Sequence, residues 1–216
     1  MKTKSMAKKI CSLAALAIFT FATPAFATLF SFDNITANNA GDAAIGESQL
    51  TVNVTDGGNG TVVFTFLNEG TEASSICDVY FDNNNGFFSG LDSIDDSLGG
   101  VEFSQYAKPV KLPGGADIGF TADFSADSDP KVQPNGVNPD EWLAFSFSLA
   151  GGYDFDDVIT SLTAGDIMFG IHVQGFESGG SEVFVNRAPV PEPTTMLLLG
   201  TGLVGLAGYS RRKKKR

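Results

Sequence analysis

Short segments in which apolar and polar residues alternate are the feature that most narrows the folds open to this chain. Leu50–Val54 and Val62–Phe66 both alternate with a period of two residues, and the turn-rich stretch Asp56–Gly60 separates them. Alternation of this kind is typical of strands that bury one face. The glycine-rich link between two such segments predicts a β-hairpin.

Seven further segments have the same character, and clusters of Gly, Asn, Asp and Pro divide them. They are Leu29–Phe32, Ile76–Phe81, Val101–Tyr106, Ile118–Phe124, Trp142–Leu149, Ile167–Val173 and Glu182–Val185. Nine short strands of this kind predict an all-β domain, an antiparallel β-sandwich with jelly-roll-like connections. One short helix is expected at Phe155–Leu162, because three aspartates near its start suit the positive end of a helix dipole.

The first 27 residues have the three parts of a secretory signal peptide. Four lysines lie within the first nine residues, an apolar stretch runs from Ile10 to Phe21, and Ala25 and Ala27 form an A-x-A cleavage site. The apolar stretch is short for a membrane span. We therefore expect a signal helix that is removed by cleavage after Ala27, with a retained N-terminal anchor as the alternative.

The other end of the chain has the pattern of a membrane-anchored tail. A proline-rich linker, residues 188–193, leads into the uncharged run 194–210. Six basic residues then end the chain: Arg211, Arg212, Lys213, Lys214, Lys215 and Arg216. As a helix at ~1.5 Å per residue the run spans roughly 25 Å, a little less than a ~30 Å hydrocarbon core. The basic end is expected to stay in the cytoplasm, which places the preceding domain, residues 28–187, outside.

The order of these features resembles the PEP-CTERM sorting tail, which is also labelled ice-binding protein C-terminal domain. The motif itself is carried by Val190, Pro191, Glu192 and Pro193. The resemblance implies that an exosortase in a Gram-negative bacterium recognises this motif and processes the protein near it. It covers only the tail and implies no activity for the domain. A plain tail anchor is the competing interpretation, but it leaves Pro-Glu-Pro unexplained.

The predicted exported domain is strongly acidic. Residues 28–187 contain 24 acidic residues and only four basic ones, Lys108, Lys111, Lys131 and Arg187. Such a surface repels nucleic acid and anionic lipid and favours solubility. Nucleic acid is therefore not an expected partner.

Few side chains of the domain are suited to catalysis. After signal cleavage Cys77 is the lone cysteine, so no internal disulfide is expected, and we expect a small buried residue in a strand. His172 is the single histidine of the chain, and nothing in the sequence links it to Cys77. A zinc site would need further nitrogen or sulfur ligands. We expect a structural or surface histidine, no catalytic residues and no cofactor.

Acidic clusters leave two alternatives open. Oxygen ligands for calcium are offered by Asp78, Asp82, Asn84 and Asp92, although their spacing is not that of an EF-hand. A soluble acidic loop with Asx-turns explains the same residues. A second group could supply the paired carboxylates of a glycosidase: Asp123, Asp127, Asp129, Asp140 and Glu141.

Taken together, these features predict an exported structural or surface-matrix protein without catalytic activity. We expect a transient membrane anchor through the C-terminal helix, processing by an exosortase, and a final place in the cell envelope or outside the cell. Extracellular polysaccharide is an expected partner. A carbohydrate- or calcium-binding module and a secreted hydrolase with paired carboxylates are the alternatives.

Overall fold

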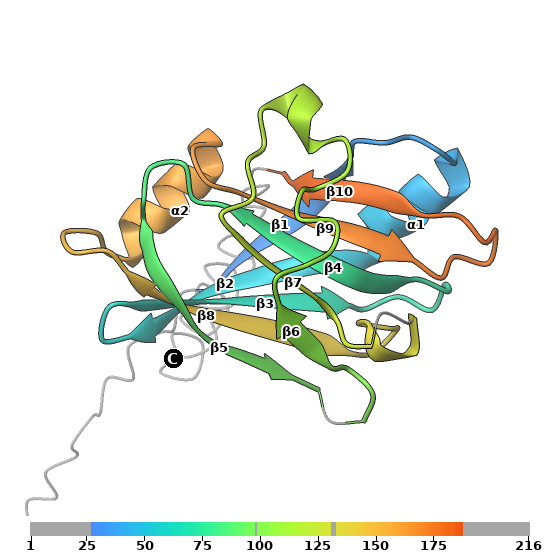
Figure 1. Cartoon of the computed structure of the whole chain (residues 1–216), viewed down its shortest axis with the longest axis horizontal. Coiled ribbons are helices and arrows are strands. Elements are labelled where there is room, and N and C mark those ends of the chain that lie inside the picture. The colour runs from blue at the N-terminus through green and yellow to red at the C-terminus, as the bar shows by residue number, and fades with distance from the viewer. Residues whose placement is uncertain (1–26, 98, 131–132, 188–216) are drawn as a thin grey trace, which may run out of the picture.

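The structure, a computed structural model, describes residues 27–97, 99–130 and 133–187 (Figure 1). The predicted signal helix, sorting motif, C-terminal membrane helix and basic end lie outside these residues, apart from Ala27 of the cleavage site. Within the described part of the chain, no helix has the length and apolar character needed to cross a membrane.

Antiparallel strands are the main regular structure of the described chain. They are β1 (Ala27–Asn34), β2 (Leu50–Gly58), β3 (Thr61–Asn68), β4 (Ser75–Asp82), β5 (Phe88–Asp96), β6 (Phe103–Gln105), β7 (Phe124–Ser128), β8 (Trp142–Leu149), β9 (Met168–Gln174) and β10 (Glu182–Asn186). The helices are α1 (Ala40–Gln49) and α2 (Phe155–Ala164), with short 3₁₀ turns at Gly115–Ile118 and Gln133–Asn135. The prediction of a mostly β, antiparallel domain is confirmed.

All ten strands belong to one sheet, in the order β5-β8-β3-β2-β1-β10-β9-β4-β7-β6. Strand β1 joins its two halves, because residues 27–31 pair with β2 and residues 32–34 pair with β10. The sheet thereby curls until it nearly closes into a barrel (Figure 1). The sequence predicted two separate sheets with jelly-roll connections. The alternation pattern did not reveal that β1 runs from one half of the sheet into the other and makes them continuous.

Phenylalanine rings fill the space between the two halves of the sheet. Phe81 of β4 lies 5.2 Å from Phe64, 5.3 Å from Phe145 and 4.7 Å from Phe147, measured between ring centroids. These three partners belong to β3 and β8 in the other half. Most of these pairs meet edge to face, the geometry that aromatic quadrupoles favour. The alternation of Phe with polar residues therefore marks the inner face, as expected.

The two helices differ in how clearly the sequence encodes them. Helix α2 begins at Phe155 as predicted, and Asp154 and Asp157 form a capping box at its N-terminus. Helix α1 was not predicted, because it contains two glycines and only a weak apolar face. It is capped by the Asn39 side chain and depends on contacts with the sheet.

Residues 106–122, which we call the outer segment, cross the outside of the second half of the sheet (Figure 1). A small cluster of buried side chains attaches this segment to the strands: Tyr80, Ala107, Leu112, Phe120 and Val183. Leu112 approaches β9 so closely that a Cβ on Gly170 would lie 2.5 Å from one of its methyl carbons. Ile118–Phe124, which overlaps the end of this segment, was predicted as a strand, but a 3₁₀ turn ends at Ile118 and β7 begins only at Phe124.

Candidate functional site

A β-bulge in β4 brings two polar side chains to the outer face of the sheet. The register against β9 shifts between Ile76 and Asp78, so that Cys77 is the extra residue. Ile76 and Val79 both point into the core, whereas Cys77 and Asp78 both line a surface hollow. A bulge re-aims side chains in this way because it interrupts the two-residue alternation.

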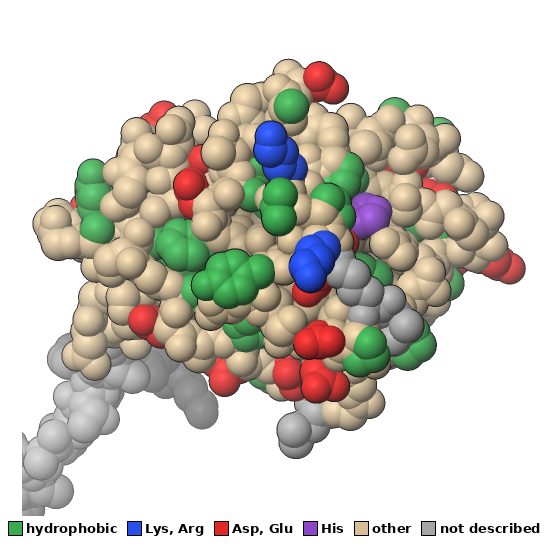
Figure 2. Space-filling model, in the orientation of Figure 1, with side chains coloured by type: hydrophobic (Ala, Val, Ile, Leu, Met, Phe, Trp, Pro, Cys, Tyr) green, Lys and Arg blue, Asp and Glu red, His purple; other side chains and the backbone are tan. Residues whose placement is uncertain are grey.

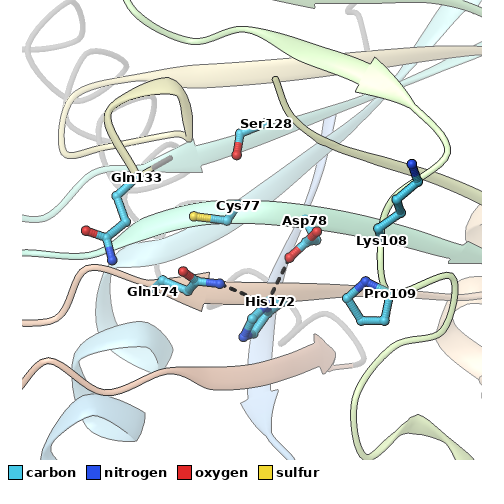
Figure 3. A pocket seen from close by; sticks show the side chains of 8 residues that line it. All are labelled: Cys77, Asp78, Lys108, Pro109, Ser128, Gln133, His172 and Gln174. Carbon is cyan, nitrogen blue, oxygen red and sulfur yellow. Dashed lines mark hydrogen bonds and ion pairs between the residues drawn. The ribbon is translucent and has the colours of Figure 1, made fainter. Parts of the chain in front are cut away.

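Asp78 and His172 form the central contact of this hollow. They are register partners on β4 and β9, and the imidazole Nδ1 lies 2.8 Å from Asp78 Oδ2. Gln174 Nε2 lies 3.4 Å from the same Nδ1 (Figure 3). The His172 side chain is 15 % exposed and that of Asp78 is 5 % exposed. The carboxylate therefore fixes the orientation of a ring that reaches the surface.

The hollow has a volume of about 160 Å³ and combines residues from three strands with two loop segments (Figure 3). Its lining consists of Cys77, Asp78, Lys108, Pro109, Ser128, Gln133, His172 and Gln174. A second, more open hollow of about 450 Å³ shares Lys108 and Ser128 with it and extends to Tyr106 and Asp129. Figure 2 views this face of the molecule, with the histidine at the surface and acidic side chains along the lower rim.

Two carboxylates lie next to each other beneath these hollows. Asp78 of β4 and Asp127 of β7 are register partners, and both are buried. Burial raises the pKa of the Tyr80 hydroxyl, and the charges of Asp78 and Asp127 raise it further. Tyr80 therefore stays protonated and donates a hydrogen bond of 2.8 Å to the Pro109 carbonyl oxygen. That bond helps to hold the start of the outer segment against the strands.

Cys77 is a buried strand residue, as the sequence predicted. Its Sγ lies 3.6 Å from the Ser75 carbonyl oxygen, and Figure 3 shows the sulfur directed away from the imidazole. Nothing in the sequence links Cys77 with His172, but the structure places both in the lining of the same hollow.

The structure does not gather the four residues considered for calcium. Asp78 and Asp82 are four residues apart on one strand, so their Cα atoms are separated by about 13 Å. Asp82 accepts hydrogen bonds from the backbone N–H groups of Asn84 and Thr121. Asp92 lies on β5 and accepts from the Ser148 hydroxyl. Among the described residues, no three His, Cys, Asp or Glu side chains are placed to hold a metal ion together.

Most acids of the second cluster stabilise local backbone. Asp123 accepts a hydrogen bond from the Asn83 N–H, Asp127 from the Lys108 N–H, and Glu141 from the Asn138 N–H. Asp127 and Asp129 line the more open hollow. The sequence did not point to Tyr106, Lys108, Gln133 or Gln174, because separate elements supply them and no spacing in the chain connects them.

Comparison with known proteins adds one finding, at the end of the chain. Residues 189–213 match the model of one family, the PEP-CTERM protein-sorting motif. The resemblance stated from Pro191-Glu192-Pro193 is thereby confirmed for the tail. Proteins with this motif are exported, sorted to the cell surface and processed by exosortases. No curated protein and no solved structure matches the chain in the same comparisons.

Proposed function

We propose that this protein is exported across the inner membrane of a Gram-negative bacterium, held there briefly by its C-terminal tail, and released by an exosortase into the envelope or an extracellular matrix. The domain, residues 28–187, then serves as a structural or binding component without catalytic activity. The observation that carries the proposal is the sorting motif at residues 189–213, directly behind the last described strand, which ends at Asn186.

The chemistry of the outer face supports a role without catalysis. The imidazole of His172 is paired with Asp78, and the thiol of Cys77 is directed to the Ser75 carbonyl oxygen. Asp82 and Asp123 accept backbone hydrogen bonds within the fold. These groups act as parts of the fold, and their hydrogen bonds explain why acids are present at these positions.

A hydrolase that uses paired carboxylates is the second candidate, and one observation favours it. Asp78 and Asp127 are register partners on neighbouring strands, which puts their Cβ atoms roughly 5 Å apart. Retaining glycosidases place their carboxyl groups at a comparable separation. The test is release of reducing ends from a panel of polysaccharides. Activity that disappears in both Asp78→Asn and Asp127→Asn would replace the non-catalytic proposal.

The sorting proposal is tested by replacing the acid of the motif. The Glu192→Ala variant keeps the apolar run and the basic end, so membrane insertion is expected to continue. Release is expected to fail, because the recognised peptide is altered. Blots of membrane and extracellular fractions from a host with an exosortase measure both steps. Glu177→Ala, which removes one exposed acid from the domain, is the matched control and should be processed normally.

The same blots would also reveal the result that contradicts the sorting proposal. If Glu192→Ala were shortened and released like the wild type, the tail would be a plain anchor and the exosortase would have no part in sorting this protein. A host without the exosortase should retain the unprocessed wild type in its membranes.

A further inference from the structure

Tyr106 has an unfavourable backbone conformation and a highly exposed ring. Its φ is +74°, in the left-handed region that glycine favours, and 78 % of the residue is exposed. A bulky residue in this conformation costs free energy and persists only where its surroundings enforce it. An exposed aromatic ring has no packing role in the fold that would explain such strain.

Three hydrogen bonds to β7 impose the conformation. The Tyr106 N–H donates to the Ser125 carbonyl oxygen at 2.8 Å, and the Ala107 N–H donates to the Ser125 hydroxyl at 3.1 Å. The Lys108 N–H then donates to Asp127 Oδ2 at 3.2 Å. The chain is thus fixed at Tyr106 and at the two residues that follow it. The result is a side chain presented to solvent from a rigid edge of the sheet.

The exposed ring borders the larger hollow on this face. Hydroxyl, amide, ammonium and carboxylate groups line the rest of it: Ser104, Gln105, Lys108, Asp127, Ser128 and Asp129. Among the residues that the structure describes, no aliphatic side chain lines this hollow. A peptide anchored by an apolar side chain would find no apolar pocket here.

We propose that this hollow binds an uncharged pyranose sugar, with the Tyr106 ring as its stacking platform. One face of a pyranose ring is a patch of C–H groups, which packs on an aromatic face, while its hydroxyls need donors and acceptors at the rim. The Tyr106 ring supplies the aromatic face, and the polar side chains that line the hollow supply the donors and acceptors. The strain at Tyr106 is explained because it presents a rigid ring at the edge of a polar hollow.

The charge of the domain favours a neutral sugar over an acidic one. Residues 28–187 contain 24 acids against four basic residues, so a polymer of uronic acids would be repelled. This inference rests on the proposed function only in that an exported domain meets polysaccharide outside the cell. Binding itself is measured on purified protein and does not depend on processing of the tail.

The test uses the full chain, purified in a detergent that has no sugar headgroup. Wild-type protein is applied to an array of neutral and uronic-acid oligosaccharides, and the strongest neutral binder is titrated by calorimetry. We expect Tyr106→Ala to weaken binding about tenfold or more, as loss of a ring contact does, and Tyr106→Phe to bind like the wild type. Trp142→Ala, which removes a partly exposed ring on β8, is the matched control and should bind normally.

The Tyr106→Gly variant separates the ring from the fold. Glycine accepts a φ of +74° without strain, so this variant should melt no lower than the wild type yet lose binding. Three results would overturn the proposal: no neutral glycan bound on the array, equal binding by Tyr106→Ala, or a preference for acidic glycans that weakens with salt. Failure of Glu192→Ala to block release would instead overturn the sorting proposal alone.

Discussion

Glu182 shows how a single buried acid can hold a loop on this domain. It is fully buried at the start of β10 and accepts hydrogen bonds from the side chains of Thr36 and Asn34 at 2.6 and 2.9 Å. The N–H groups of Asn38 and Asn39 also donate to it. Burial alone would raise the pKa of this carboxyl, but the four hydrogen bonds outweigh it, and the pKa is lowered. The charged form therefore ties the loop before α1 to the sheet.

Replacing Glu182 by Gln is expected to lower the free energy of unfolding by about 1–3 kcal/mol at neutral pH, because hydrogen bonds to a charged acceptor are lost. Since the folded pKa lies below the ordinary value of 4.5, this stabilisation is complete above that value. It is lost as the pH falls through the folded pKa. Denaturant titrations of wild type and variant between neutral and acid pH measure the difference.

The exposed Glu177→Gln variant is the control for that series and should track the wild type. A difference between wild type and Glu182→Gln that stayed constant into the acid range would contradict the role of the charge. It would mean that the shape of the side chain alone matters.

At the scale of elements, the sequence revealed those whose own residues carry the signal. Strand β8 was predicted with its observed bounds because it is apolar from Trp142 and alternates strictly between apolar and polar residues over Phe145–Leu149. Strand β5 was missed, because two register shifts against β8 break its alternation and two of its three exposed positions, Asp92 and Asp95, are acidic. Its charges suit a strand at the edge of a sheet, where they discourage pairing with other chains. A strand whose alternation is interrupted is difficult to recognise in the sequence, even though hydrogen bonding to its neighbouring strand stabilises it.

The candidate site was hidden for a related reason. Cys77 and Asp78 share a face only because of the bulge, and a bulge is decided by the partner strand and not by local sequence. His172 joins them through the β4–β9 register, which links residues almost a hundred positions apart. The sequence shows that these residue types are present, but only the order and register of the strands show that they lie close together.

Helix α1 offers a test of how tightly an element can be packed. A Cβ on Gly46 would lie 2.2 Å from Phe184 Cζ, and the Phe184 ring is fully buried. Gly46→Ala would gain about 1 kcal/mol of helix propensity. Overpacking against a ring that cannot move costs about 1–3 kcal/mol or more. We therefore expect a net loss of stability in thermal and denaturant unfolding.

Gly151→Ala is the matched control, because a Cβ there meets nothing within 4 Å. Its stability should stay within about 0.5 kcal/mol of the wild type. If Gly46→Ala were more stable than the wild type, the Phe184 ring would have to reorient to make room for the added methyl group. The packing of α1 against the sheet would then be looser than described here.

At the scale of the whole molecule, the phenylalanine core makes the two halves of the sheet one cooperative unit. Phe81→Ala should lower the free energy of unfolding by about 3–5 kcal/mol, because its ring lies between both halves. Trp142 fluorescence reports on the first half, and circular dichroism reports on all strands. Both signals should shift together and trace one transition. Two separate transitions would mean that the halves fold independently.

The position of β10 in the sheet has a consequence for the timing of export. It lies between β1, which joins the two halves, and β9, so it hydrogen-bonds β1 to the rest of the second half. It is also the last described strand in the chain, ending four residues before Val190 of the sorting motif. If the chain crosses the membrane from its N-terminus, the other described strands reach the outside before β10, and the sheet stays incomplete until β10 follows. The sheet can therefore be completed at nearly the same time as the sorting motif emerges, and this chain order favours a finished domain when an exosortase meets the motif.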